Sequence, residues 1–178
     1  MEFPLIGFAK EFYYFFYGLF TNLKSTWRTP KAFQSTKEQC PFCSSKIKEL
    51  QEVLSMEKTF TFYCLTPAVK GNLLIMPKRH VTRFEELSHE EMIEIQSSMK
   101  IIAKAFKDLW LMNDYIILQK NGLLAGQSEA HVHFHVIPCK KYPPYKILKK
   151  ALHFRRKISN EEMQARVKEL KAYFERKN

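Results

Sequence analysis

Three histidines recur at every second position in residues 130–138, which read AHVHFHVIP. Successive side chains of a β-strand point to opposite faces, so this alternation predicts a strand with three imidazoles on one face. The opposite face suits a hydrophobic core, since it carries Val132, Phe134 and Val136. Alternate residues of a strand lie about 6.5 to 7 Å apart, which is too far for His131, His133 and His135 to bind one ion without a bulge. The pattern therefore favours an extended ligand that each imidazole touches at a different point.

The other strands are predicted from short β-rich runs. Residues 59–66 and 72–78 are apolar and are separated by the turn-forming sequence PAVKG, so they predict a hairpin. Residues 114–120 predict a further strand, which a glycine-containing loop joins to the histidine strand.

Two helices are predicted from capping patterns that precede apolar stripes. Ser88 and Glu91 have the spacing of a capping box at the start of a helix over residues 87–111, and Ser159 with Glu162 opens a C-terminal helix. The chain order is thus two strands, a helix, two strands and a final helix. This order indicates an α+β fold with a mainly antiparallel sheet.

Residues 1–28 form an aromatic-rich extension, which a polar linker at residues 29–39 follows. The extension is a poor secretory signal, because Glu2 comes first and no basic residue precedes the apolar run. Its uncharged run, residues 12–23, is too short to span a membrane. Apolar side chains recur at helical spacing, which predicts a helix packed on the body of the protein or on a partner chain. The alternative is an interfacial helix that contacts a membrane peripherally through residues 5–24.

The formal net charge of +11 favours anionic partners. The basic residues are dispersed and no nucleic-acid-binding motif accompanies them, so no nucleic-acid partner is expected. Four cysteines, two of them in the sequence CPFC, indicate metal or redox chemistry in a reducing compartment rather than a disulfide framework. The sequence therefore predicts a cytoplasmic protein, with membrane association through the extension left open.

The CPFC sequence supplies two candidate metal ligands, Cys40 and Cys43. Structural zinc takes four ligands from cysteine and histidine. Two histidines stand at the ends of predicted strands: His80 follows residues 72–78, and His131 lies at the entry of the histidine strand. One structural zinc ion per chain is therefore predicted at these four residues. One alternative is a redox-active CxxC, which leaves the histidines unexplained; another is an open catalytic metal bound by all three histidines of the strand.

Three segments together resemble the histidine-triad (HIT) superfamily of nucleotide hydrolases and transferases. They are CPFC, GNLLIMPKRHVTRFEEL and AGQSEAHVHFHVIP, and they resemble in particular the zinc-bearing branch found in many bacteria. The resemblance covers about residues 40–138 and divides the chain into an extension and linker (1–38), a HIT domain (39–140) and a basic C-terminal segment with a helix (141–178). It implies an antiparallel sheet of about five strands with flanking helices, and a homodimer in which two sheets join.

The resemblance also implies a reaction. A nucleoside phosphate derivative, either a phosphoric anhydride or a phosphoramidate, would be attacked at its α-phosphorus by the middle histidine, His133, to give a nucleotidyl-histidine intermediate. His135, Gln127 and Ser128 would hold phosphate oxygens or the leaving group. Imidazole chemistry agrees, because imidazole is nucleophilic at neutral pH and a covalent intermediate divides one difficult displacement into two easier ones. A zinc ion held by His80, His131 and the two cysteines would then brace the fold, since four protein ligands leave no open position.

The sequence departs from the family pattern where relatives often contact the substrate. Cys64 stands where an acidic or amide residue often holds the ribose hydroxyls, and Asn72 replaces a common histidine. Lys120 takes the position of an amide residue that often contacts phosphate, with Asn121 next to it. Lys120 could contact phosphate as a charge, so Lys120 and Asn121 are further candidate substrate-binding residues. A non-catalytic nucleotide-binding or scaffold protein is the remaining alternative.

Overall fold

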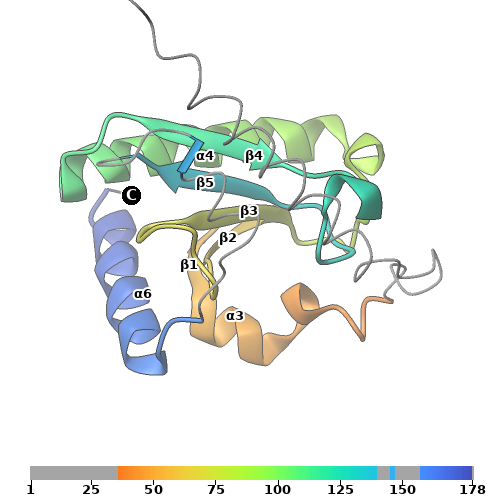
Figure 1. Ribbon diagram of the computed structural model, residues 1–178, viewed down its shortest axis with the longest axis horizontal. Helices are drawn as coiled ribbons and strands as arrows, with labels where there is room; N and C mark the ends of the chain where they lie inside the picture. The colour runs from red at the N-terminus through yellow and green to blue at the C-terminus, as the bar shows by residue number, and fades with distance from the viewer. Residues whose placement is uncertain (1–35, 140–144, 147–156, 178) are drawn as a thin grey trace, which may run out of the picture. The chain divides into compact units, whose positions relative to one another are not determined.

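The computed structural model describes residues 36–139, 145–146 and 157–177, and the predicted N-terminal helix lies outside these ranges. The described strands form one five-stranded antiparallel sheet with the order β1-β2-β3-β5-β4. The strands are β1 (Glu52–Ser55), β2 (Thr59–Tyr63), β3 (Leu73–Pro77), β4 (Tyr115–Gln119) and β5 (Phe134–Pro138). The α+β class and the antiparallel sheet of five strands are therefore confirmed (Figure 1).

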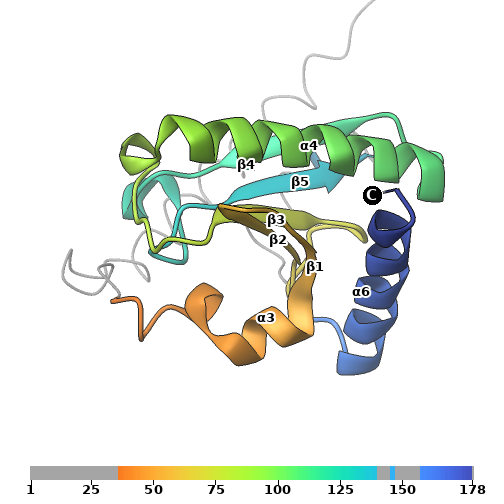
Figure 2. The same ribbon diagram turned by 180° about the vertical axis from the view of Figure 1, so that it is seen from behind.

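Helices cover both faces of this sheet. The long helix α4 (His89–Trp110) crosses one face, and the C-terminal helix α6 (Asn160–Glu175) packs beside β1 (Figure 2). The short helix α3 (Ser45–Gln51) contacts β1 and β2. Three short 3-10 helices complete the described elements: η1 (Pro41–Cys43), η2 (Phe84–Glu86) and η3 (Leu123–Ala125). None of the helices in the described ranges has the length and apolar character that a membrane span requires.

Both predicted helix starts are confirmed. The Ser88 hydroxyl accepts a hydrogen bond from the backbone N–H of Glu91 at 3.2 Å, and the Glu91 carboxylate accepts one from the Ser88 N–H at 2.8 Å. The Ser159 hydroxyl accepts a hydrogen bond from the N–H of Glu162 at 3.2 Å in the same way. These bonds satisfy backbone donors that the first turn of a helix leaves without partners.

The main core lies between the sheet and helices α4 and α6. Its helical side chains include Ile95, Ile102, Phe106, Met163 and Leu170, all fully buried. The alternate apolar residues of the histidine segment, Val132, Phe134 and Val136, belong to the same core. The predicted division of that segment into an apolar face and a histidine face is therefore confirmed. A second core on the other face of the sheet contains Cys40, Phe42, Phe60, Phe62, Cys64, Leu74 and Met76.

The histidine strand is shorter than predicted. β5 begins at Phe134, so that His131 and His133 precede it instead of lying within it. The reason lies in β3: the N–H of Lys78 bonds to Lys58 on the β2 side, so the preceding residue, Pro77, faces β5. Proline has no N–H to donate to a ladder, and the pairing of β3 with β5 ends at Ile75 and Phe134. The N–H of Val132 instead bonds to the carbonyl of Val81 at 2.7 Å.

Candidate active site and metal centre

Four predicted ligands converge on one point between η1, the segment after β3 and the start of the histidine segment. The ligand atoms of Cys40, Cys43, His80 and His131 all lie within 4.8 Å of one another. The Sγ–Nδ1 distances are 3.4 Å from Cys40 to His131, 3.5 Å from Cys43 to His80 and 3.6 Å from Cys43 to His131. A tetrahedral ion with metal–sulfur bonds of about 2.3 Å and metal–nitrogen bonds of about 2.0 Å separates such atoms by roughly 3.5 Å. The donor set therefore fits a tetrahedral metal ion.

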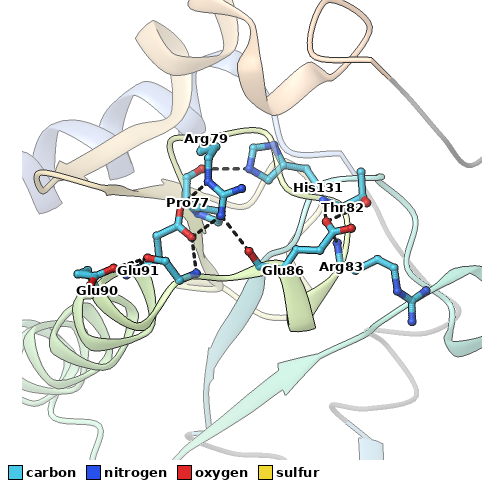
Figure 3. Close-up of polar contacts among 9 residues, drawn as sticks. Pro77, Arg79, Thr82, Arg83, Glu86, Glu90, Glu91 and His131 are labelled. Atoms are coloured by element: carbon cyan, nitrogen blue, oxygen red, sulfur yellow. Dashed lines mark hydrogen bonds and ion pairs between the residues drawn. The ribbon is translucent and has the colours of Figure 1, made fainter.

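The ring of His131 is oriented for this role. It is fully buried, and its Nε2 donates a hydrogen bond to the carbonyl oxygen of Pro77 at 3.0 Å (Figure 3). Because a carbonyl only accepts, the proton resides on Nε2, and Nδ1 presents its lone pair to the cysteines. Burial lowers the pKa of His131 to about 4, which keeps the imidazole in the neutral form that binds metals.

Cys40 lies in a buried environment that disfavours an uncompensated thiolate. Its side chain is 2 % exposed, and burial raises the pKa of the thiol to about 12. A thiolate at this position would carry a large desolvation penalty unless a positive charge compensated it. A metal ion bound between Cys40 and Cys43 would supply that charge.

The two remaining histidines of the triad lie side by side next to this cluster. His133 Nδ1 donates a hydrogen bond to the carbonyl oxygen of His131 at 2.8 Å, so that Nε2 carries the lone pair. The ring centroids of His133 and His135 are 5.2 Å apart, and His135 Nδ1 lies 3.5 Å from Asn72 Nδ2. Phe42, at the centre of CPFC, packs edge-on against His133 at 5.3 Å. The sequence prediction did not include Phe42, although its place between two candidate ligands was a usable signal.

The loop before the triad is braced by Gln127. Its side chain is 1 % exposed; its oxygen accepts from the N–H of Gly122 at 2.6 Å, and its nitrogen donates to the carbonyls of Thr82 and Glu129 at 3.1 and 2.9 Å. These bonds hold the loop backbone in place, and the following residue, Ser128, is exposed. The side-chain amide of Gln127 thus bonds to backbone groups of the loop and to the carbonyl of Thr82.

The other predicted substrate-binding residues lie around this loop. Lys120 lies along it, because a Cβ added to Gly126 would be 3.7 Å from Lys120 Nζ. Asn121 accepts a hydrogen bond from the N–H of Phe84 at 3.0 Å and donates one to the Glu85 carboxylate at 2.8 Å, so its amide ties the loop to η2. Cys64 is buried in the second core. Ser128 is exposed, and Lys120 and Asn121 are half-buried.

Sequence reasoning also missed an ion pair next to the four candidate metal ligands, between the exposed Arg79 and the buried Glu91. Arg79 Nε and Nη2 donate to the two carboxylate oxygens of Glu91 at 3.1 and 2.9 Å, and Nη2 also donates to the Glu86 carbonyl at 2.9 Å (Figure 3). Burial alone would raise the pKa of Glu91, which is 4 % exposed, but hydrogen bonds from Arg79 and from the Ser88 N–H lower the pKa below its usual value. The sequence feature that could have indicated this pair is Arg79, which directly precedes the candidate ligand His80.

Comparisons with known proteins identify the family to which this chain is similar. Residues 46–142 match the family model of the HIT domain. The chain is 35 % identical over 101 residues to an uncharacterized HIT-like protein of Methanocaldococcus jannaschii, covering 56 % of this chain and 78 % of the relative. It is also 35 % identical over 101 residues to an adenosine 5′-monophosphoramidase of Schizosaccharomyces pombe, covering 56 % and 73 %.

Solved structures show the same fold. A histidine triad nucleotide-binding protein of Sulfolobus tokodaii has a TM-score of 0.59 at 27 % identity, covering 78 % of this chain and 95 % of that chain. A zinc-bound histidine triad family protein of Mycobacterium smegmatis has a TM-score of 0.62 at 21 % identity, covering 80 % and 100 %. With the family model, the curated relatives and the fold in agreement, the chain belongs to the HIT family.

Proposed function

We propose that this protein is a nucleotide hydrolase or nucleotidyltransferase that cleaves nucleoside phosphate derivatives at the α-phosphorus. The observation that carries the proposal is the hydrogen bond from His133 Nδ1 to the His131 carbonyl, which places the proton of the neutral imidazole on Nδ1 and the nucleophilic lone pair on Nε2. Relatives support the substrate class, since one is named an adenosine 5′-monophosphoramidase and another, of Dictyostelium discoideum and 30 % identical, a bis(5′-adenosyl)-triphosphatase. Phosphoramidates and phosphoric anhydrides are therefore the proposed substrates.

The reaction proceeds in two displacements. His133 Nε2 attacks the α-phosphorus and forms a phosphorus–nitrogen bond, while the bond to the leaving group breaks and the leaving group departs with its electrons. Water, or another acceptor in a transfer reaction, then attacks the same phosphorus and loses a proton to solvent. The phosphorus–nitrogen bond breaks, its electron pair returns to His133 Nε2, and the nucleotide is released. His135, Ser128 and Lys120 stabilise the charge on the phosphate oxygens, and Gln127 with Asn121 holds the loop that places them.

We also propose that Cys40, Cys43, His80 and His131 hold one structural zinc ion per chain. Support comes from the Sγ–Nδ1 distances of 3.4 to 3.6 Å and from the hydrogen bond that turns His131 Nδ1 toward the cysteines. Four protein ligands leave no open coordination position. The ion would therefore fix the start of the histidine segment, and the chemistry stays with His133.

The proposed partners follow from exposed surfaces and from the sequence. β4 is an edge strand, and its residues Tyr115 and Ile117 are 41 % and 45 % exposed. An edge strand with exposed apolar side chains suits pairing with a second copy of the chain, which supports a homodimer. A cytoplasmic location, with peripheral membrane contact through residues 5–24, remains part of the proposal.

The test of the proposed activity is turnover on a defined panel. The full chain is incubated with adenosine and guanosine 5′-phosphoramidates and with dinucleoside polyphosphates, and released nucleotides are separated by chromatography. We expect a nucleoside monophosphate from at least one substrate, with purified His133→Asn protein as the control for contaminating hydrolases. A panel on which the wild-type protein and this variant release equal amounts would refute the proposed activity.

We predict that the aromatic extension is dispensable for chemistry. A truncated chain that begins at Lys37 retains the four candidate metal ligands, the triad and both capped helices. Its kcat and KM should therefore stay within a few-fold of the full chain, while its oligomeric state or its retention on lipid vesicles changes. Kinetics, light scattering and vesicle sedimentation measure the three properties. A folded but inactive truncated protein would show that the extension contributes to the active site.

A further inference from the structure

One short segment supports both histidine ligands of the metal cluster. In residues 77–81, the Pro77 carbonyl accepts the hydrogen bond from His131 Nε2 at 3.0 Å. Three residues later, His80 presents Nδ1 to Cys43 at 3.5 Å. The Val81 carbonyl then accepts the N–H of Val132 at 2.7 Å. The position of this segment therefore sets the geometry of two of the four ligands.

The segment leaves the sheet directly after Pro77, and residues 78–82 have no helix or strand structure. Arg79, in the middle of the segment, connects it to helix α4 through the two hydrogen bonds to the Glu91 carboxylate. A two-pronged arginine–carboxylate pair fixes orientation as well as distance, which a single contact does not. The bond from Arg79 to the Glu86 carbonyl adds a third attachment.

Glu91 is itself held rigidly. Its carboxylate accepts the N–H of Ser88 at 2.8 Å in the capping box, and its side chain is 6 % exposed. The helix behind it is anchored in the main core by Ile95 and Ile102, which are 1 % and 0 % exposed. The start of α4 is therefore a fixed point from which Arg79 can position the segment.

We propose that the Arg79–Glu91 ion pair is a positioning device for the metal centre, holding residues 77–81 so that His80 and His131 are arranged before the metal binds. The inference rests on the zinc site proposed above. Without the pair, metal binding would have to order residues 77–81, and the conformational entropy lost would weaken the affinity. Loss of outer partners of a metal site typically lowers metal affinity by about 10-fold to 100-fold.

The test measures zinc affinity by competition with a chromogenic chelator. Glu91→Gln is the first variant, because glutamine still accepts the Ser88 N–H and keeps the helix cap while losing the charged partner of Arg79. Arg79→Gln removes the other side of the pair, and Arg79→Lys retains the charge without the two-pronged geometry. Arg166→Gln is the matched control, since Arg166 pairs with Glu169 at 2.8 Å within α6.

We expect Glu91→Gln and Arg79→Gln each to weaken zinc affinity by about tenfold or more, and Arg79→Lys to recover part of the loss. The double variant should resemble the single variants, because both remove one shared interaction. Arg166→Gln should bind zinc as the wild type does.

Affinities of the Glu91→Gln and Arg79→Gln proteins equal to that of the wild type would overturn the inference and leave the zinc site standing. An equal loss in Arg166→Gln would also overturn it, because the effect would then follow general stability. A wild-type protein that binds no zinc would overturn the metal site itself, and the inference with it.

Discussion

Replacement of His133 by asparagine is expected to lower turnover by at least about 10³-fold, because it removes the covalent nucleophile and leaves only binding and charge stabilisation. The fold should be retained. The asparagine side-chain amide can replace His133 Nδ1–H as the donor to the His131 carbonyl, a bond of 2.8 Å in the structure. Metal content should also stay unchanged, since the four clustered ligands do not include His133.

The matched comparison is replacement of His135, the neighbouring imidazole. His135 is proposed to stabilise charge on phosphate, so its loss should lower turnover by about 10²-fold to 10³-fold, as for one preorganised donor. Rapid-quench mass spectrometry gives a second measurement: the wild-type peptide that contains residue 133 should carry a nucleotide during turnover, and the His133→Asn peptide should not. Near-wild-type turnover by His133→Asn on a substrate that the wild type cleaves well would exclude the nucleophile assignment.

The sequence predicted best the features that depend on local periodicity. The alternation of residues 131–136 placed the apolar side chains in the main core, and the serine–glutamate spacings placed the starts of α4 and α6. Each of these signals works within a few residues, where side-chain direction follows from backbone geometry alone.

Other elements escaped prediction for physical reasons. Helix α3 and strand β1 have seven and four residues, too few for a periodic pattern to emerge, and β1 is stabilised by pairing with β2. The pairing of β3 with β5 ends early because Pro77 faces β5. The side of β3 that Pro77 faces depends on the strand register, which is set by the folded sheet and not by the local sequence.

In the candidate site, too, some residues were predicted from the local sequence pattern and others depend on the tertiary structure. The four clustered ligands were predicted because cysteine and histidine have few structural roles in such a pattern. Gln127 and Asn121 were predicted to touch substrate, yet their amides bond to Gly122, Phe84 and Glu85. An amide suits a ligand and a loop backbone equally well, so spacing alone does not distinguish the two roles. The Arg79–Glu91 pair joins residues from a loop and a helix, and only the folded chain brings them together.

Replacement of Cys43 by serine is the second change for which we expect a large effect. Cys43 Sγ lies 3.5 Å from His80 Nδ1 and 3.6 Å from His131 Nδ1, so it contacts both histidine ligands. Zinc content should fall from one ion per chain to nearly none. The free energy of unfolding should fall by several kcal/mol, well above the roughly 1 kcal/mol typical of a point substitution, because binding energy at a structural zinc site is folding energy.

The matched control is Cys64→Ser, which changes a buried cysteine that is 5 % exposed and lies outside the metal cluster. Elemental analysis and urea unfolding, each with and without a strong chelator, measure the two quantities. Chelation should destabilise the wild-type and Cys64→Ser proteins but should have little further effect on Cys43→Ser. The main core between the sheet and α4 contains none of the four ligands, so the metal-free protein should retain its helical content while η1 and residues 77–81 loosen. A wild-type protein purified without chelator that contains no metal, or a Cys43→Ser protein that keeps one zinc ion per chain, would show that the cluster is not the zinc site.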